Sequence, residues 1–243
     1  MVLNNTENVI HIKHPYDVWI VDNFLDATVL DSVLKAWPKA NSDLWHSGYK
    51  KLNESNNILE QKMLSISKRS GLSNYINDFL DFVHSKKMTI VIGNITSENR
   101  LISDVTERWS GLRMMLEGSH QLIHSDARRH PENGLRKEIT CLLYLGPDPV
   151  IDGNLEIWGD DMQSCLHEIE PKTNRLVIFK NSDTSYHGVP KVSSLRKSIT
   201  WSIMSTSESS TRGKALFVKR PQDPSEVGDL GILRSKIGDN NEN

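Results

Sequence analysis

The pattern of apolar and polar positions predicts mainly helices in the first part of the chain. Residues 16–21 have the apolar and β-branched character of a strand. Asp26 then has the residue type of an N-cap, and apolar residues follow it at helical spacing until Pro38. Apolar residues three and four apart predict two more amphipathic helices, over residues 58–69 and 73–84. We therefore expect one short strand followed by helices.

The pattern changes at Gly111, after which short apolar runs alternate with turn residues. The run at residues 139–145 is typical of a buried strand and ends at Gly146. Many short strands at this spacing indicate a sandwich or barrel. We therefore predict an α+β fold, with a jelly-roll core of the double-stranded β-helix (cupin-like) type and N-terminal supporting helices. The predicted core strands cover residues 112–116, 122–126, 139–145, 155–158, 166–169, 176–179, 186–189 and 198–204.

The domain organisation follows from the length of the chain. At 243 residues the protein can bury one sizeable core, so we expect a single domain. Residues 16–110 should form mainly helical support and residues 111–204 the jelly roll. Residues 205–243 form a Ser-rich and charged C-terminal extension, with a candidate strand at residues 216–218.

Composition narrows the choice of partners. A formal net charge of -2 provides no bulk attraction to nucleic acid or to an anionic membrane. Residues 1–8 lack the regions of a secretory signal, and no apolar run approaches the ~18 residues of a membrane span. Cys141 and Cys165 form neither a C-x-x-C motif nor a disulfide framework. We expect a soluble cytoplasmic protein without nucleic-acid or membrane partners, whose oligomeric state stays open.

Candidate chemistry is concentrated between His124 and Arg196. Alternate side chains of a strand share a face, so His124 and Asp126 in the sequence His-Ser-Asp should project together. A second histidine, His187, lies on a later predicted strand. Two imidazoles and one carboxylate leave open positions on a metal and suit Fe(II) and O2 chemistry. Arg196 would then hold the carboxylate of a co-substrate.

A second pair of residues also has metal-ligand spacing. His130 and Glu132 flank Pro131. Proline removes a donor from a β-ladder and indicates a loop, so this pair is the less favoured alternative.

At His124, Asp126, His187 and Arg196 the chain resembles the Fe(II)- and 2-oxoglutarate-dependent dioxygenases of the prolyl-4-hydroxylase-like group. The resemblance covers residues 19–204 and includes several stretches in order. Residues 87–96 have a β-branched run typical of a strand, but their position in the family favours a helix. Asn154 departs from the family, where a second glycine is usual. The stretches that match are DNFL (22–25), ITCLLYL (139–145), GNLEIW (153–158), IEPKTNRLVIF (169–179), SYHG (185–188) and RKSITW (196–201).

The resemblance implies a role for each matching residue. His124, Asp126 and His187 correspond to the iron ligands. Arg196 corresponds to the residue that pairs with the distal carboxylate of 2-oxoglutarate, assisted by the hydroxyl groups of Ser198 and Tyr144. The implied cofactors are Fe(II), 2-oxoglutarate as co-substrate and O2, with ascorbate in a supporting role. Related halogenases lack the carboxylate, so an intact Asp126 favours hydroxylation over halogenation.

The sequence indicates the substrate-binding residues less clearly than the metal ligands. Arg113, Gln121, Arg129 and Trp158 are candidates because they lie near the predicted metal strand or have the residue types that line pockets. Cations at the mouth of the site could hold a carboxylate or a phosphate. The alternative is that Arg128, Arg129, Arg136 and Lys137 form a solvated charged loop, and that Trp158 packs in the core.

We therefore expect an oxygenase that hydroxylates an aliphatic carbon, with decarboxylation of 2-oxoglutarate to succinate. The substrate is either a peptide residue of the prolyl type or a small molecule. One alternative is desaturation or demethylation at the same iron. Another is a metal- or ligand-binding sensor module that has the same fold but no turnover.

Overall fold

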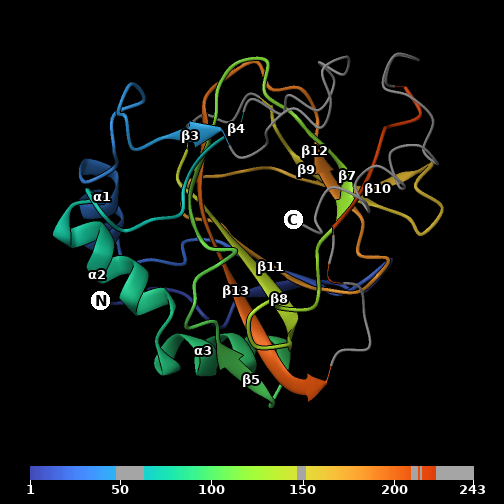
Figure 1. Cartoon of the computed structure of the whole chain (residues 1–243), viewed down its shortest axis with the longest axis horizontal. Coiled ribbons are helices and arrows are strands. Elements are labelled where there is room, and N and C mark those ends of the chain that lie inside the picture. The colour runs from blue at the N-terminus through green and yellow to red at the C-terminus, as the bar shows by residue number, and fades with distance from the viewer. Residues whose placement is uncertain (48–62, 147–151, 209–212, 214, 223–243) are drawn as a thin grey trace.

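Two antiparallel sheets face each other in the computed structural model (Figure 1). The structure describes residues 1–47, 63–146, 152–208, 213 and 215–222. The larger sheet has the order β1 (Val9–Ile12), β2 (Val18–Val21), β11 (Leu176–Lys180), β8 (Leu135–Tyr144), β13 (Arg196–Glu208), β6 (Gly111–Met115), β4 (Met63–Ile66) and β3 (His46–Ser47), and β5 (Leu101–Ser103) also pairs with β13. The smaller sheet has the order β10 (Cys165–Ile169), β9 (Leu155–Trp158), β12 (His187–Val189), β7 (Gln121–Ser125) and β14 (Leu216–Val218). The predicted α+β jelly roll is confirmed.

The larger sheet is buried on both faces, which explains the continuous apolar run of β8. Ile139, Cys141 and Leu143 point to the helical side and join one core cluster. The side chains between them point the other way, so Leu142 and Tyr144 join the core between the two sheets. This alternation is the two-residue period of a strand. It leaves one face of the sheet for packing against helices and the other for a cavity.

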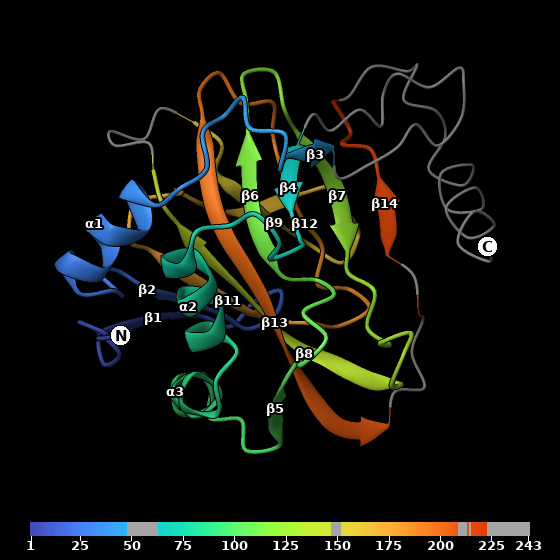
Figure 2. The same ribbon diagram turned by 60° about the vertical axis from the view of Figure 1, so that its left-hand side comes forward.

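Three helices cover the outer face of the larger sheet (Figure 2). They are α1 (Ala27–Lys35), α2 (Asn74–Val83) and α3 (Lys86–Thr96). The carboxylate of Asp26 caps α1 by accepting a hydrogen bond from the Thr28 amide, as the sequence predicts. In α3, Met88 and Ile92 are buried four residues apart, so the helical interpretation of residues 87–96 is confirmed.

The helix predicted over residues 58–69 is wrong where the structure describes it. Residues 63–66 form strand β4, which pairs with β6, and residues 58–62 lie outside the described part of the chain. Met63 faces the inner core and Ile66 the helical side. A short strand that is apolar on both faces has the same residue types as a buried helical turn, and pairing with β6 decides between them.

The first part of the chain also supplies strands that the pattern does not predict. β1, β3 and β5 all join the larger sheet, so residues 16–110 contribute strands as well as helical support. Strand β14 coincides with the candidate strand at residues 216–218, and it pairs with β7. In the described ranges, no helix is both long and apolar enough to cross a membrane.

Candidate metal centre and co-substrate pocket

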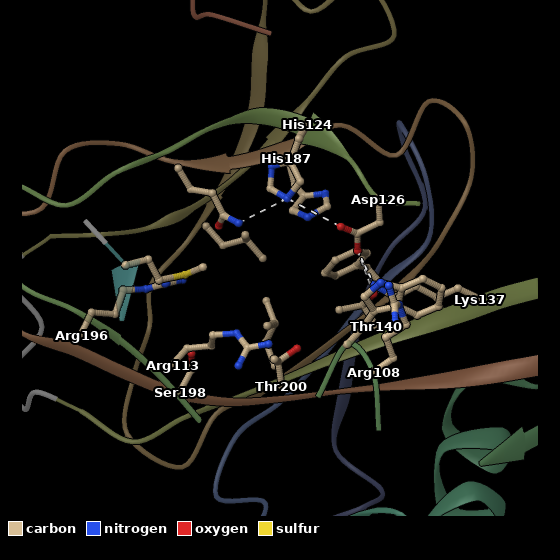
Figure 3. A pocket seen from close by; sticks show the side chains of 16 residues that line it. Arg108, Arg113, His124, Asp126, Lys137, Thr140, His187, Arg196, Ser198 and Thr200 are labelled. Carbon is tan, nitrogen blue, oxygen red and sulfur yellow. Dashed lines mark hydrogen bonds and ion pairs between the residues drawn. The ribbon is translucent and has the colours of Figure 1, made fainter. Parts of the chain in front are cut away.

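A cavity of about 190 Å³ lies between the two sheets. Figure 3 shows a cluster of two histidines and a carboxylate on one side of it, with Arg113, Ser198 and Thr200 across from them. The described lining residues are Met63, Arg108, Trp109, Arg113, Gln121, His124, Asp126, Lys137, Thr140, Leu142, Leu155, Phe179, His187, Arg196, Ser198 and Thr200.

The smaller sheet brings the three predicted metal ligands together. His124 lies near the end of β7, and His187 begins β12 directly opposite it in the antiparallel register. Asp126 follows β7 on the same face as His124. One donor atom from each of the three residues lies within 4.8 Å of the others. In the part of the chain that the structure describes, no other group of three such side chains does so.

Both imidazoles are oriented by backbone carbonyl groups. The Nδ1 atom of His124 lies 2.9 Å from the carbonyl oxygen of Leu122, and Nδ1 of His187 lies 2.9 Å from that of Ser185. A carbonyl oxygen can only accept, so Nδ1 carries the proton in each ring and Nε2 is left as the ligand atom. Burial lowers the pKa of His124 to about 3, aided by the neighbouring His187, and burial also lowers the pKa of His187. The rings are therefore neutral at neutral pH, the form that binds a metal.

Asp126 is held by Lys137, which one of the alternatives from the sequence places in a solvated charged loop. Burial by itself would raise the pKa of Asp126, but the positive charge of Lys137, with smaller contributions from His187 and His124, outweighs it and keeps that pKa below its usual value. The Nζ atom of Lys137 lies 2.6 Å from Oδ2, and Thr140 donates to the same oxygen at 3.3 Å. The other oxygen, Oδ1, lies 3.7 Å from Nε2 of His124. Asp126 therefore presents one oxygen to the histidines.

A β-bulge explains how Lys137 reaches the cavity. Ile139 pairs with Ile203 of β13, but Lys137 pairs with the very next residue, Met204. Glu138 is thus an extra residue in β8, and the alternation of side chains changes there. Simple alternation from Thr140 would place Lys137 on the opposite face. The bulge is the feature that sequence reasoning missed.

Arg196 lies at the other end of the cavity, where it is buried. It donates from Nη1 to Sδ of Met115 at 3.1 Å and from Nη2 to the hydroxyl of Tyr144 at 2.9 Å. Its Nε is buried and has no hydrogen-bond partner among the described residues. Ser198 lines the cavity, whereas Tyr144 is fully buried behind Arg196. Tyr144 therefore acts on the cavity through the guanidinium group, with its ring 4.8 Å from the Arg196 Cζ.

The structure divides the four substrate candidates into two groups. Arg113 and Gln121 line the cavity, and Nε2 of Gln121 lies 3.4 Å from Nε2 of His124. Arg129 is exposed and outside the lining, where its backbone bridges to that of Arg136. Trp158 is also outside the lining. Its indole packs in a separate cluster and donates to Glu156 at 3.1 Å.

The alternative ligand pair does not form. Nδ1 of the buried His130 accepts from the backbone amide of Glu132, and its Nε2 lies 2.7 Å from the hydroxyl of Thr106. The Glu132 carboxylate pairs instead with Arg108 at 3.4 Å. Asn154, the departure from the family pattern, bonds to Glu168 at 3.0 Å, away from the cavity lining.

Strand β14 reaches the metal centre from the C-terminal extension. Phe217 pairs with His124 in the register and stacks on its ring, with centroids 5.0 Å apart and planes 13° apart. Figure 2 shows β14 alongside β7. Just beyond it, the buried Arg220 pairs with Glu156 at 2.6 Å and donates to the Gln121 carbonyl at 2.7 Å. The extension is thus fixed to the strand that carries the first ligand.

Comparison with known proteins agrees with this site. Residues 110–203, which include His124, Asp126, His187 and Arg196, match the model of the 2OG-Fe(II) oxygenase superfamily. Over this segment the chain is similar to the 2OG-Fe(II) oxygenase superfamily, as the resemblance at these residues predicts. No curated protein sequence matches the chain.

Solved structures share the fold at low sequence identity. A prolyl-4-hydroxylase from Pseudomonas putida is 13% identical with a TM-score of 0.54, over 77% of this chain and 92% of that one. A prolyl hydroxylase from Trichoplax adhaerens was solved in complex with a hypoxia inducible factor oxygen degradation domain peptide fragment. It is 17% identical with a TM-score of 0.53, and the match covers 77% of this chain and 83% of that one. A prolyl 4-hydroxylase from Phytophthora capsici is 16% identical with a TM-score of 0.51, over 90% of this chain and 68% of that one.

Proposed function

We propose that the protein is an Fe(II)- and 2-oxoglutarate-dependent oxygenase that hydroxylates an aliphatic carbon of a small molecule or a peptide residue. One observation carries the proposal: the cluster of His124, Asp126 and His187 shares a single cavity with the buried guanidinium of Arg196. A cavity with only the ligands would suit many metals, and a cavity with only the arginine would suit many anions. Both together fit a metal and a dicarboxylate.

The ligand residues fit Fe(II). Two neutral imidazoles present Nε2, and the third ligand is a carboxylate with one oxygen already occupied by Lys137 and Thr140. This two-histidine, one-carboxylate set leaves positions open for other ligands. Fe(II) held by these residues, with 2-oxoglutarate and O2, would supply oxidation of a substrate C–H bond coupled to conversion of 2-oxoglutarate to succinate and CO2.

Arg196 fits the far carboxylate of 2-oxoglutarate. Its Nε is buried without a partner in the described residues, and an anion at this end of the cavity would satisfy it. Tyr144 and Met115 hold the guanidinium in place, and Ser198 offers a hydroxyl two residues along the same strand. A charge-assisted hydrogen bond of this kind is worth about twice a neutral one.

Apolar side chains form part of the cavity wall, which supports an oxidation at a site shielded from water. Leu142, Leu155 and Phe179 line it between the polar groups. The Trichoplax structure holds a peptide, which supports keeping a peptide residue among the substrate classes, and the small size of the cavity supports a small molecule.

The test is anaerobic addition of Fe(II) and 2-oxoglutarate, monitored by the weak visible metal-to-ligand band. Wild type should develop the band, and His187→Ala and Arg196→Ala should lose it at the same concentrations. Arg129→Ala is the matched control, because Arg129 is an exposed arginine outside the cavity lining. A wild-type protein that binds the metal but gives no band at saturating 2-oxoglutarate would contradict the proposal.

A further inference from the structure

A second cavity lies beside the metal centre and is larger than the one that contains the metal ligands. Its volume is about 460 Å³, within the ~300–1,000 Å³ that is usual for ligand pockets. The connections β1–β2, β7–β8 and β11–β12 contribute to it, together with the first part of β8. Its described lining residues are Lys13, Pro15, Tyr16, Asp17, Arg128, Arg136, Glu138, Lys180, Asn181 and Ser182.

One hydrogen bond links the walls of the two cavities. The Nδ2 atom of the buried Asn181 donates to Oγ1 of Thr140 at 3.0 Å. Asn181 lines the second cavity, whereas Thr140 lines the metal cavity and donates to Oδ2 of Asp126 at 3.3 Å. The two described linings have no residue in common. A ligand in the second cavity would therefore lie next to the metal centre without contacting the predicted metal ligands.

The second cavity is lined by four cations and two carboxylates in the described residues. Two of the cations donate hydrogen bonds to carboxylates, Arg136 to Glu138 and Lys180 to Glu98. The other two cations, Lys13 and Arg128, make no hydrogen bond to a carboxylate within the described ranges. Fixed positive charge of this kind attracts anions.

Arg128 is the residue best placed to fix an anion. Its side chain is only 12% exposed, and its Nε is buried without a hydrogen-bond partner in the described part of the chain. Asp183 forms an ion pair with Arg128, but Oδ1 lies 3.7 Å from Nη1, which is beyond hydrogen-bonding distance. Asp183 is also 54% exposed and outside the described lining. A buried N–H without an acceptor costs free energy, and an oxyanion in the cavity would satisfy it.

The other walls suit an anion that carries an organic group. Lys13 is exposed at the rim, so it can attract an anion but is less able to fix one. The hydroxyl oxygen of Ser182 accepts from the Thr184 amide at 3.2 Å, which leaves its hydrogen to donate to a ligand. Pro15 and the buried ring of Tyr16 provide an apolar part of the wall.

We propose that the second cavity binds a small molecule with an oxyanion group, a phosphate or a carboxylate, through the guanidinium group of Arg128. This molecule is a ligand in addition to the oxidised substrate, because its cavity is separate from the one that contains the metal ligands. The inference goes beyond the proposed function and does not depend on it.

The experiment uses the full chain without metal and two probes added separately, inorganic phosphate and acetate. Phosphate binding is followed by the width of its phosphorus NMR line, and acetate binding by saturation transfer from the protein to its methyl protons. The wild type should bind at least one probe saturably. Binding of phosphate alone indicates a phosphorylated ligand, and binding of acetate indicates a carboxylate.

The variants test whether Arg128 is responsible. Arg128→Gln should weaken binding of the probe by about tenfold or more, as expected for the loss of a charge-assisted contact. Arg128→Lys keeps the charge but loses the Nε donor, so it should weaken binding by a smaller factor. The matched controls Arg129→Gln and Arg129→Lys, at an exposed arginine outside the described lining, should bind as the wild type does.

A further variant, Arg196→Gln, tests the location, because Arg196 is the buried arginine of the metal cavity. It should bind the probe as the wild type does. Near-ultraviolet circular dichroism shows which variants are folded. If Arg128→Gln does not fold, the comparison of Arg128→Lys with Arg129→Lys decides.

Three results would overturn the inference. One is a wild type that binds neither probe saturably. Another is equal binding in the folded variants at Arg128 and Arg129, which would mean that the probe is not held in the second cavity. The third is loss of binding in Arg196→Gln, which would place the anion in the metal cavity. None of these results affects the Fe(II)–2-oxoglutarate band, so the proposed function is tested separately.

Discussion

The Nζ atom of Lys137 lies 2.6 Å from Oδ2 of Asp126, inside the cavity that also holds His124 and His187. The lysine side chain is 6% exposed and the aspartate 21%, so the pair is shielded from water. A shielded charge is costly unless it is paired. Lys137 therefore stabilises the ionised Asp126 before a metal binds, and it occupies the oxygen that the metal does not need.

Replacing Lys137 with methionine keeps most of the length of the unbranched side chain but removes its charge. The metal-free variant should be less stable by about 3 kcal/mol, because the shielded Asp126 carboxylate loses the positive charge that is paired with it. A divalent metal supplies a new positive charge, so Mn(II) should raise the melting temperature more in Lys137→Met than in wild type. Thermal unfolding with and without Mn(II) measures both effects.

The control for this prediction is Lys191→Met, at an exposed lysine. It should change neither the stability of the metal-free protein nor the rise in melting temperature that Mn(II) causes. Equal metal-induced shifts in the wild type and Lys137→Met would show that Lys137 does not act on Asp126.

Phe217 should act as a positioning residue for His124. Its ring stacks on the imidazole, so Phe217→Ala removes one support of the ligand ring and should weaken metal binding by about tenfold. Mn(II) titration followed by electron paramagnetic resonance measures the affinity. Leu216→Ala truncates the neighbouring side chain on the same strand, and we expect a smaller effect. If the two variants weaken binding equally, the stack has no particular role.

Much of the site is predictable because it depends on local rules. Strand alternation places His124 and Asp126 together, and the order of the later strands places His187 and Arg196. The buried run of β8 is recognisable because helices cover one face and the second sheet covers the other.

The remaining features depend on register and pairing between distant segments. Lys137 enters the cavity through a bulge, and nothing in the residues around Glu138 indicates one. Phe217 meets His124 only because β14 pairs with β7, almost a hundred positions earlier in the chain. Residues 63–66 form a strand because β6 offers an open edge. Tertiary contacts determine this register and pairing, and the local sequence gives little indication of either.

His84 should make the stability of the fold sensitive to acid. Burial lowers its pKa below 6.5, outweighing the attraction of the Glu107 and Asp104 carboxylates, and both ring nitrogens lack hydrogen-bond partners among the described residues. The unfolded chain therefore binds a proton more readily than the folded one. The free energy of unfolding should fall as the pH drops below 6.5 towards the folded-state pKa.

Replacing His84 with leucine removes this proton linkage. Urea unfolding near pH 7.5 and near pH 5 should show a smaller acid-induced loss of stability in His84→Leu than in the wild type. If the free energy of unfolding changes between the two pH values by the same amount in His84→Leu and in the wild type, His84 is protonated as easily in the folded protein as in the unfolded chain.

The most direct test of the oxygenase assignment is the formation of succinate from 2-oxoglutarate in air. With Fe(II) and ascorbate, the wild type should form succinate slowly without substrate and faster when a substrate is present. Arg196→Gln and His187→Ala should form none above the background without protein. A wild type that forms the Fe(II)–2-oxoglutarate complex but yields no succinate under any of these conditions would contradict turnover, and would favour a sensor that binds both ligands.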